Sequence, residues 1–230
     1  MSSASAPRYV RHRTLFSDHA WNTLMTTSVV VVGCGGLGSN VLEALSRLAP
    51  LDLHLWDPGI LDEPDLNRQI LYTAHDLGRP KVERAAEVLS HVNPDLSITT
   101  HPVALTSSNF IPPDRSFVVF DCLDSFQARA ALEWIRSHHQ VPVFHGGAEG
   151  WCGQVHTFLP DSKGYADVFG PDYARIGPGG KPILSPTVAT IAAAQVNEFV
   201  HWCHDPQTPL SGKMLIYNGK TMDVDFLTVG

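Results

Sequence analysis

A glycine-rich loop is the first feature of this sequence with an evident chemical use. Gly33-Cys34-Gly35-Gly36-Leu37-Gly38 follows the β-branched run 28–32 and opens an amphipathic stretch, which is the strand–loop–helix context of a phosphate-binding turn. Glycine lets the backbone approach a phosphate closely, and the first N–H groups of the helix point at the anion. The sequence therefore predicts a nucleotide held by Gly33, Gly35, Gly36, Leu37 and Gly38.

A carboxylate stands at the end of the next predicted strand. Asp57 follows Gly38 by 19 residues and is placed to accept hydrogen bonds from ribose hydroxyls. These two features fit an ATP site and the NAD site of a dehydrogenase equally well, and a glycine turn without a ligand is a third interpretation. The residues beyond Asp57 are needed to choose between them.

Two cations beyond the second strand favour cleavage of a triphosphate. Arg68 lies 11 residues after Asp57, within Leu66-Asn67-Arg68-Gln69, and Lys81 follows 13 residues later. Fixed cations stabilise the charge that builds up on phosphoryl oxygens in a transition state, whereas hydride transfer has no such need. Each cation alone could be a solvated surface residue, and their spacing does not decide the matter.

A pair of carboxylates ends the fourth predicted strand in Asp121-Cys122-Leu123-Asp124. Magnesium in nucleotide sites is held by one or two carboxylates together with phosphate oxygens. The alternative is that one carboxylate caps the helix that begins near Ser125. We predict that Asp124 is a Mg²⁺ ligand and that Asp121 supports the helix or loop.

Short apolar runs alternate with amphipathic segments along most of the chain. The predicted strands are 28–32, 51–56, 96–100, 117–120, 141–144 and 153–159, and the predicted helices are 37–48, 80–91, 125–138 and 184–204. A strand pair, 214–217 and 222–227, closes the chain. This order predicts an α/β fold with a Rossmann-like, doubly wound, mostly parallel sheet and C-terminal antiparallel strands.

The order of the elements also places the candidate residues. Ligands of such a sheet bind at the carboxyl ends of its strands, so Gly33–Gly38, Asp57, Asp121–Asp124 and His145–Gly147 should face one crevice. The segment 160–182 is rich in Gly, Pro and Asp, and we expect a functional loop or a crossing segment there. One domain over 8–230 should follow a disordered tail at 1–7.

Composition excludes several classes of function. The 230 residues are 43% hydrophobic and 17% charged, with 16 Lys and Arg against 23 Asp and Glu and a net charge of −7. This balance argues against a nucleic-acid binder, and no apolar run is long enough for a membrane span. Four scattered cysteines form neither a disulfide framework nor a zinc knuckle, so we expect a cytoplasmic protein.

The motifs together resemble the ThiF/MoeB/HesA family, the bacterial sulfur-carrier adenylyltransferases related to ubiquitin-activating enzymes. The resemblance runs from about Arg8 to Gln154 and resumes weakly over 212–223. Its motifs are Arg8-Tyr9-x-Arg11, Gly33-x-Gly35-Gly36-Leu37-Gly38, Asp57, Leu66-x-Arg68-Gln69, Gly78-x-Pro80-Lys81-Val82-Glu83, Asn93-Pro94 and Asp121-Cys122-x-Asp124.

The resemblance implies a role for each matching residue. Asp57 would hold the ribose, Arg68 and Lys81 the phosphates, and Asp124 the Mg²⁺, with Gln69 and Leu123 also lining the ATP site. Arg11 would reach into the ATP site of a partner copy, which implies a homodimer. The resemblance therefore implies one ATP-binding adenylyltransferase domain over 8–230, with Arg11, Arg68, Lys81 and Asp124 as catalytic residues.

Three departures from the family pattern bear on the substrate. Both C-x-x-C pairs of the family's structural zinc are absent, so no zinc is expected, and 179–184 holds no crossover cysteine. Cys152 lies near the edge of the site but does not align with that cysteine. Asp57-Pro58-Gly59 replaces an Asp-x-Asp motif, and Asp65 stands where Asn is common. A thioester intermediate is therefore not expected, whereas adenylation alone is.

The sequence thus predicts activation of a carboxylate as an acyl-adenylate, with release of pyrophosphate. The first candidate substrate is the C-terminal glycine of a small ubiquitin-like sulfur-carrier protein, and the second is a small-molecule carboxylate or cofactor precursor. An NAD-binding oxidoreductase is the third hypothesis, against which Arg68, Lys81 and Asp124 argue. A catalytically silent subunit is the fourth, and the retained cations argue against it.

Overall fold

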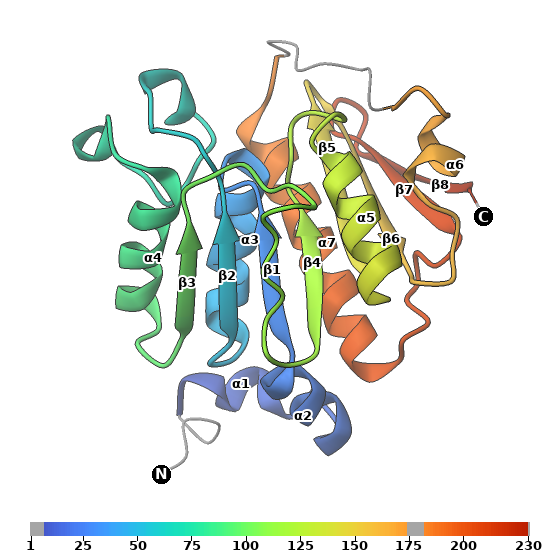
Figure 1. Cartoon of the computed structure of the whole chain (residues 1–230), viewed down its shortest axis with the longest axis horizontal. Helices are drawn as coiled ribbons and strands as arrows, with labels where there is room; N and C mark the ends of the chain where they lie inside the picture. Colours follow the sequence, from blue (N-terminus) through green and yellow to red (C-terminus); the bar gives the residue numbers. More distant parts are fainter. Residues whose placement is uncertain (1–6, 174–181, 230) are drawn as a thin grey trace.

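One eight-stranded sheet runs through the whole molecule (Figure 1). The computed structural model describes residues 7–173 and 182–229. The strand order is β3-β2-β1-β4-β5-β6-β7-β8. The strands are β1 Ser28–Val32, β2 Asp52–Trp56, β3 Ser97–His101, β4 Phe117–Asp121, β5 Val143–Glu149, β6 Cys152–Phe158, β7 Lys213–Asn218 and β8 Asp223–Thr228.

The pairing directions confirm the predicted fold class. Strands β3, β2, β1, β4 and β5 pair in parallel, and the pairs β5–β6, β6–β7 and β7–β8 are antiparallel. Every residue of β1 and β4 is buried, because helices cover both faces of a parallel sheet. That double coverage is why these strands appear in the sequence as continuous apolar runs.

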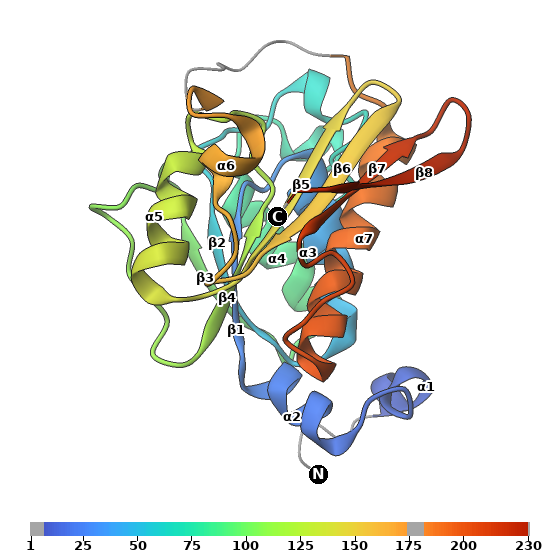
Figure 2. The ribbon, with the colours of Figure 1, turned by 90° about the vertical axis from the view of Figure 1, so that its right-hand side faces the viewer.

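Helices form one layer on each face of the sheet (Figure 2). On one face α7 packs against α3, β5 and β6, and α4 packs against α3 and β3. On the other face lie α5 and α6 (Figure 2). The helices are α1 Val10–Arg13, α2 Asp18–Thr26, α3 Gly36–Leu48, α4 Lys81–Val92, α5 Arg129–His139, α6 Tyr165–Phe169 and α7 Ser185–His204.

The N-terminal segment is helical, which the sequence did not predict. Pro7 begins a 3-10 helix, Pro7–Tyr9, so the tail predicted at 1–7 is one residue too long, and residues 1–6 lie outside the described part of the chain. The Tyr9 side chain is buried and its hydroxyl accepts a hydrogen bond from Asn93 Nδ2 at 2.9 Å. Ser17 caps α2 by accepting from Ala20 N.

The long connection predicted at 160–182 contains a further helix, α6. Asp167 accepts from Gly164 N at 2.9 Å and so stabilises the first turn of this helix. Residues 174–181 of the predicted loop lie outside the described residues. Among the helices of the described ranges 7–173 and 182–229, none is both long and apolar enough to cross a membrane.

Candidate functional site

The sheet register brings three of the predicted segments together. Val32 at the end of β1 is the register partner of Trp56 on one side and of Asp121 on the other. The residues that follow each strand, Gly33, Asp57 and Cys122, therefore leave the same edge of the sheet as neighbours. This edge is a topological switch point, since the chain runs from β1 to β2 on one side and returns to β4 on the other, and open α/β sheets bind ligands at such points.

Two glycines of the loop are required by the backbone around them. Gly33 has φ +95°, and a Cβ there would lie 2.6 Å from the carbonyl oxygen of Cys122. A Cβ at Gly38 would overlap the carbonyl oxygen of Gly33. The loop can therefore turn against β4 and start α3 only with glycine at both positions.

Asp57 fixes the glycine loop from the neighbouring strand end. Its two carboxylate oxygens accept hydrogen bonds of 2.6 Å from Cys34 N and from Gly59 N. A carboxylate oxygen has a second lone pair, so these bonds leave acceptor capacity for a ribose hydroxyl. The loop is also held by the Tyr72 hydroxyl, which donates to the Cys34 carbonyl oxygen at 2.8 Å. The sequence analysis did not identify Tyr72.

Lys81 is the first residue of α4, and its side chain runs back over the loop after Asp57. A Cβ at Gly59 would lie 3.2 Å from Lys81 Cδ and Cε, and the Lys81 backbone N donates to the Gly59 carbonyl oxygen at 3.0 Å. The Lys81 Nζ lies 3.0 Å from Asp65 Oδ2. This places the ammonium group beside the loop that Asp57 anchors.

Arg68 and Gln69 approach the same loop from the segment between β2 and α4. The aliphatic part of Arg68 lies against Gly36, where a Cβ would be 3.4 Å from Arg68 Cγ and Cδ. Gln69 is 2% exposed, and its Nε2 donates to Asp65 Oδ1 at 2.6 Å. The structure thus brings the predicted Arg68, Gln69 and Lys81 together around Asp65.

Asp124 is exposed after the end of β4, and Leu123 is partly buried beside it. The described residues contain no cluster of three or more His, Cys, Asp or Glu that could hold a metal by themselves. A single accessible carboxylate beside a phosphate-binding loop fits Mg²⁺, which takes one or two protein carboxylates and completes its shell with phosphate oxygens and water. The geometry is therefore compatible with Mg²⁺ bound jointly by Asp124 and a nucleotide.

The other carboxylate of this motif, Asp121, is at the centre of a buried polar cluster. Its Oδ2 accepts from Arg129 Nε at 2.8 Å, from His145 Nδ1 at 2.6 Å and from the Tyr165 hydroxyl at 2.8 Å. Burial opposes ionisation, but Arg129 and the hydrogen bonds from His145 and Tyr165 outweigh it and lower the pKa of Asp121 to about 2. The predicted support role of Asp121 thus extends over three elements.

His145 is held as a neutral imidazole within this cluster. Burial lowers the pKa of His145 and the Asp121 carboxylate only partly opposes this. Gln154 Nε2 lies 3.1 Å from His145 Nε2, and an amide nitrogen can only donate. His145 therefore carries its proton on Nδ1, directed at Asp121, and accepts from Gln154 on Nε2. The sequence analysis placed His145 at the edge of the sheet but gave it no role.

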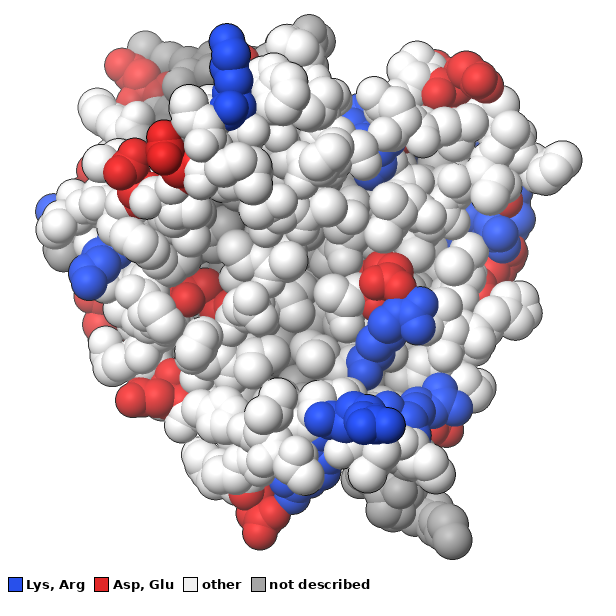
Figure 3. All heavy atoms as spheres, turned by 180° about the vertical axis from the view of Figure 1, so that it is seen from behind, with Lys and Arg blue, Asp and Glu red and all other residues white. Residues whose placement is uncertain are grey.

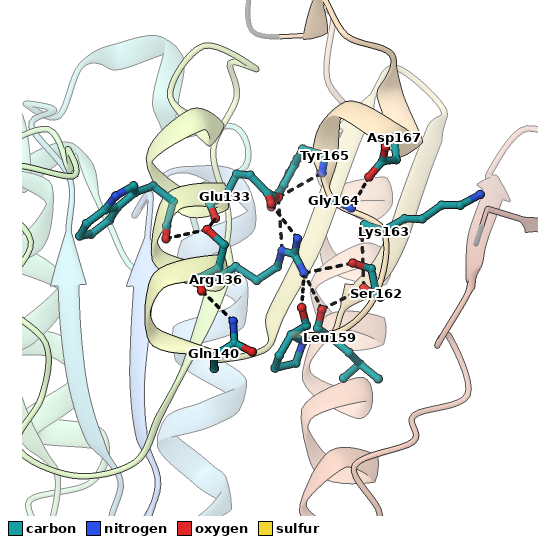
Figure 4. Close-up of polar contacts among 12 residues, drawn as sticks. Glu133, Arg136, Gln140, Leu159, Ser162, Lys163, Gly164, Tyr165 and Asp167 are labelled. Atoms are coloured by element: carbon teal, nitrogen blue, oxygen red, sulfur yellow. Dashed lines mark hydrogen bonds and ion pairs between the residues drawn. The ribbon is translucent and has the colours of Figure 1, made fainter.

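An ion-pair network holds the segment that brings Tyr165 to Asp121 (Figure 4). Arg136 on α5 donates to the carbonyl oxygens of Leu159 at 2.7 Å and Pro160 at 2.9 Å. Glu133, which pairs with Arg136 at 2.7 Å, accepts from Tyr165 N at 3.1 Å. These bonds fix the start of α6 against α5. Sequence patterns gave no signal for this network, because its partners lie in different elements.

Arg11 lies at the opposite end of the molecule from the glycine loop of its own chain. It is exposed on α1, where the neighbouring His12 Nε2 lies 2.7 Å from the carbonyl oxygen of Leu48 at the end of α3. Helix α3 begins at the glycine loop and has 13 residues, which span about 20 Å. Figure 3 shows Lys and Arg side chains gathered at this lower end, near the N-terminal helices.

Known proteins resemble this chain over nearly its whole length. A family model described as the ThiF family matches residues 9–230. The SAMP-activating enzyme E1 of Haloferax volcanii is 29% identical over 240 residues, covering 100% of this chain and 86% of that protein. The molybdopterin-synthase adenylyltransferase of Escherichia coli is 27% identical over 229 residues, covering 96% and 91%. The crystal structure of E. coli MccB with ATP shares the fold, with a TM-score of 0.82 and 18% identity over 100% of this chain and 74% of that one.

Proposed function

This chain belongs to the ThiF family and is an adenylyltransferase, and we propose that it activates a carboxylate as an acyl-adenylate at the carboxyl edge of β1, β2 and β4. One observation carries the proposal. The glycine loop, an acceptor for ribose, two cations for phosphates and an accessible carboxylate for Mg²⁺ all meet at the switch point of the sheet.

The proposed reaction is an in-line displacement at the α-phosphorus of ATP. A carboxylate oxygen of the substrate forms a bond to this phosphorus, and the bond from the α-phosphorus to the oxygen that bridges to the β-phosphate breaks. Pyrophosphate leaves with the electron pair, so no proton has to be transferred. Catalysis then depends on orientation and on stabilising the negative charge of the departing phosphates.

The residues of the chain divide this work. Asp57 accepts from the ribose while it anchors the loop through Cys34 and Gly59. Arg68 and Lys81 stabilise the charge on the β- and γ-phosphates. When bound, Mg²⁺ neutralises phosphate charge beside Asp124. Gln69 and Leu123 complete the walls of the ATP site.

The proposed substrate is the C-terminal glycine of a small ubiquitin-like sulfur-carrier protein. The similarity to a SAMP-activating enzyme and to a molybdopterin-synthase adenylyltransferase, both matched over most of their length, supports this choice. The sequence has no cysteine between Cys152 and Cys203, where the family's crossover cysteine would lie. The adenylate would therefore pass to an external nucleophile without a covalent bond to the enzyme.

The same missing cysteine supports a second candidate, a small-molecule carboxylate. A thioester-forming cysteine serves the transfer of a carrier protein, and an enzyme that only adenylates a small acid has no need of it. Exchange of labelled pyrophosphate into ATP tests both candidates. Exchange that requires a protein ending in Gly-Gly supports the first, and exchange that requires a small acid supports the second. No exchange with any carboxylate, together with tight NAD binding, would reject both.

We further propose that the enzyme works as a homodimer in which Arg11 of one copy serves the ATP site of the other. The position of Arg11, at the far end of α3 from its own glycine loop, supports this arrangement. Arg11→Ala and Lys81→Met should each be inactive, and mixing the two variants should restore part of the activity, because one site of a mixed dimer has both residues. A mixture that stays inactive although mixed dimers form would reject a role in trans.

A further inference from the structure

The carboxylate of Asp65 is surrounded by nitrogen donors. Lys81 Nζ lies 3.0 Å from Oδ2, and Gln69 Nε2 donates to Oδ1 at 2.6 Å. Arg68 NH2 lies 3.7 Å from Oδ1, and Asp62 N donates to Oδ2 at 3.2 Å. Four donors that converge on two oxygens form an anion-binding site, and the anion in it is a side chain of the protein.

This anion stands among the groups proposed to hold phosphates. The Lys81 stem passes Gly59, the residue whose N–H donates to Asp57, and the Arg68 stem lies on Gly36 of the glycine loop. The side chains of Lys81 and Asp65 are both 14% exposed. Water therefore screens their interaction only partly, and a second anion brought to Lys81 and Arg68 would feel the charge of Asp65.

We propose that Asp65 competes with nucleotide phosphates for Lys81 and Arg68, and that it thereby lowers the affinity of the site for ATP and for pyrophosphate. This inference rests on the proposed function of the same site. Asp65 keeps the two cations positioned over the loop, and its negative charge weakens their hold on the phosphates. Release of pyrophosphate is the step that gains, because pyrophosphate binds through phosphates alone.

The charge of Asp65 can be removed with little change of shape. Asp65→Asn keeps an oxygen that can accept from Gln69 or from Asp62 N, and it removes the ion pair with Lys81. If the competition operates, this variant should bind pyrophosphate and a non-hydrolysable ATP analogue about tenfold more tightly, which equals about 1.4 kcal/mol. AMP, which carries neither the β- nor the γ-phosphate, should bind with nearly unchanged affinity.

Isothermal titration calorimetry on the full chain would measure these affinities. Asp62→Asn is the matched control, because Asp62 lies in the same turn and its Oδ1 accepts only from the backbone of Glu63 at 2.8 Å. This control should change none of the three affinities. If Asp65→Asn does not fold, Asp65→Ser serves instead, since its hydroxyl oxygen can still accept from Asp62 N.

A double-mutant cycle separates the competition from a structural effect. In a Lys81→Met background, Asp65→Asn should change pyrophosphate affinity much less than in the wild type. Weaker binding in Asp65→Asn would overturn the inference, because Asp65 would then support the ligand or its metal. An equal gain for AMP, or an undiminished gain without Lys81, would also overturn it. Failure of the wild type to bind ATP would instead reject the proposed function.

Discussion

Two clusters at the same edge of the sheet use a carboxylate in opposite ways. Asp65 gathers Lys81, Arg68 and Gln69 in a corner where the charged side chains are 14–25% exposed. Asp121 gathers Arg129, His145 and Tyr165 where side chains are at most 4% exposed. The first cluster can exchange its partners with a ligand from solvent, whereas the second has its partners built in and cannot exchange them without loss of stability.

The buried cluster works as a brace for the open corner. Asp121 joins the end of β4 to α5, β5 and α6 through side chains from all three. Its second oxygen accepts from Leu123 N at 3.1 Å, which fixes the backbone one residue before Asp124. Rigid, satisfied polar contacts thus set the position of a carboxylate that must itself stay accessible. The comparison predicts that the buried cluster governs stability and the open corner governs activity.

The largest effect should follow from removing the buried negative charge. Asp121→Asn leaves the Arg129 guanidinium buried without its counter-ion, which costs about 3–5 kcal/mol of unfolding free energy. Urea denaturation followed by tryptophan fluorescence measures this loss. Asp65→Asn is the comparison variant and should lose much less, because its cations are accessible to water. A loss below about 1 kcal/mol for Asp121→Asn would show that the cluster is not a brace.

A smaller free-energy change, with a large effect on rate, should follow from removing a cation of the open corner. Lys81→Met should slow ATP–pyrophosphate exchange about 100-fold or more, the typical effect of losing a group that stabilises transition-state charge. Methionine keeps most of the aliphatic stem, so unfolding free energy should change little. Steady-state exchange and urea denaturation on one preparation test both. A stable variant with unchanged exchange would remove Lys81 from the proposed mechanism.

The smallest effect concerns pH and again falls on the buried region. Burial lowers the pKa of His156 to about 4, below the usual value of about 6.5 in an unfolded chain. The unfolded state then binds more protons between these values, so stability is full above pH 6.5 and falls as the pH drops towards 4. The loss from pH 7 to pH 5 is on the order of 2 kcal/mol.

The pH prediction has an internal control. The pKa of Asp121 is about 2, so its contribution persists above pH 4 and does not overlap this window. His145, whose pKa is also lowered by burial, adds to the loss in the same direction. His156→Gln should therefore flatten the dependence of stability on pH between 7 and 5 without abolishing it. An unchanged slope in that variant would show that His156 does not titrate as its burial implies.

The sequence was sufficient for the regular part of this fold. Apolar runs bounded by Gly, Pro or Asp located β1, β2 and β4 to within a residue, because strands buried on both faces carry no polar positions. The rule that parallel strands present ligands at their carboxyl ends then placed Gly33, Asp57 and Asp124 at one edge. Local pattern and topology were enough for both steps.

The remaining features depend on contacts that no local pattern encodes. The N-terminal helices are held by pairs such as Tyr9 with Asn93, and α6 forms in a Gly- and Pro-rich segment fixed by Glu133 and Arg136. The sequence marked Asp65 only as a departure from a familiar pattern. That it pairs with Lys81 became evident only when the fold brought the two side chains together.

Transfer of the α-phosphate of ATP tests the central claim most directly. The wild-type chain would be mixed with ATP labelled at its α-phosphate, Mg²⁺ and either a Gly-Gly-tailed carrier protein or a small carboxylic acid, and the products separated. We predict that the label appears on the carboxylate as an acyl-adenylate, in equal amount to the pyrophosphate released, and that Lys81→Met abolishes both. Label recovered in ADP would mean transfer of the γ-phosphate, and this result, or unconsumed ATP with every carboxylate, would contradict the account.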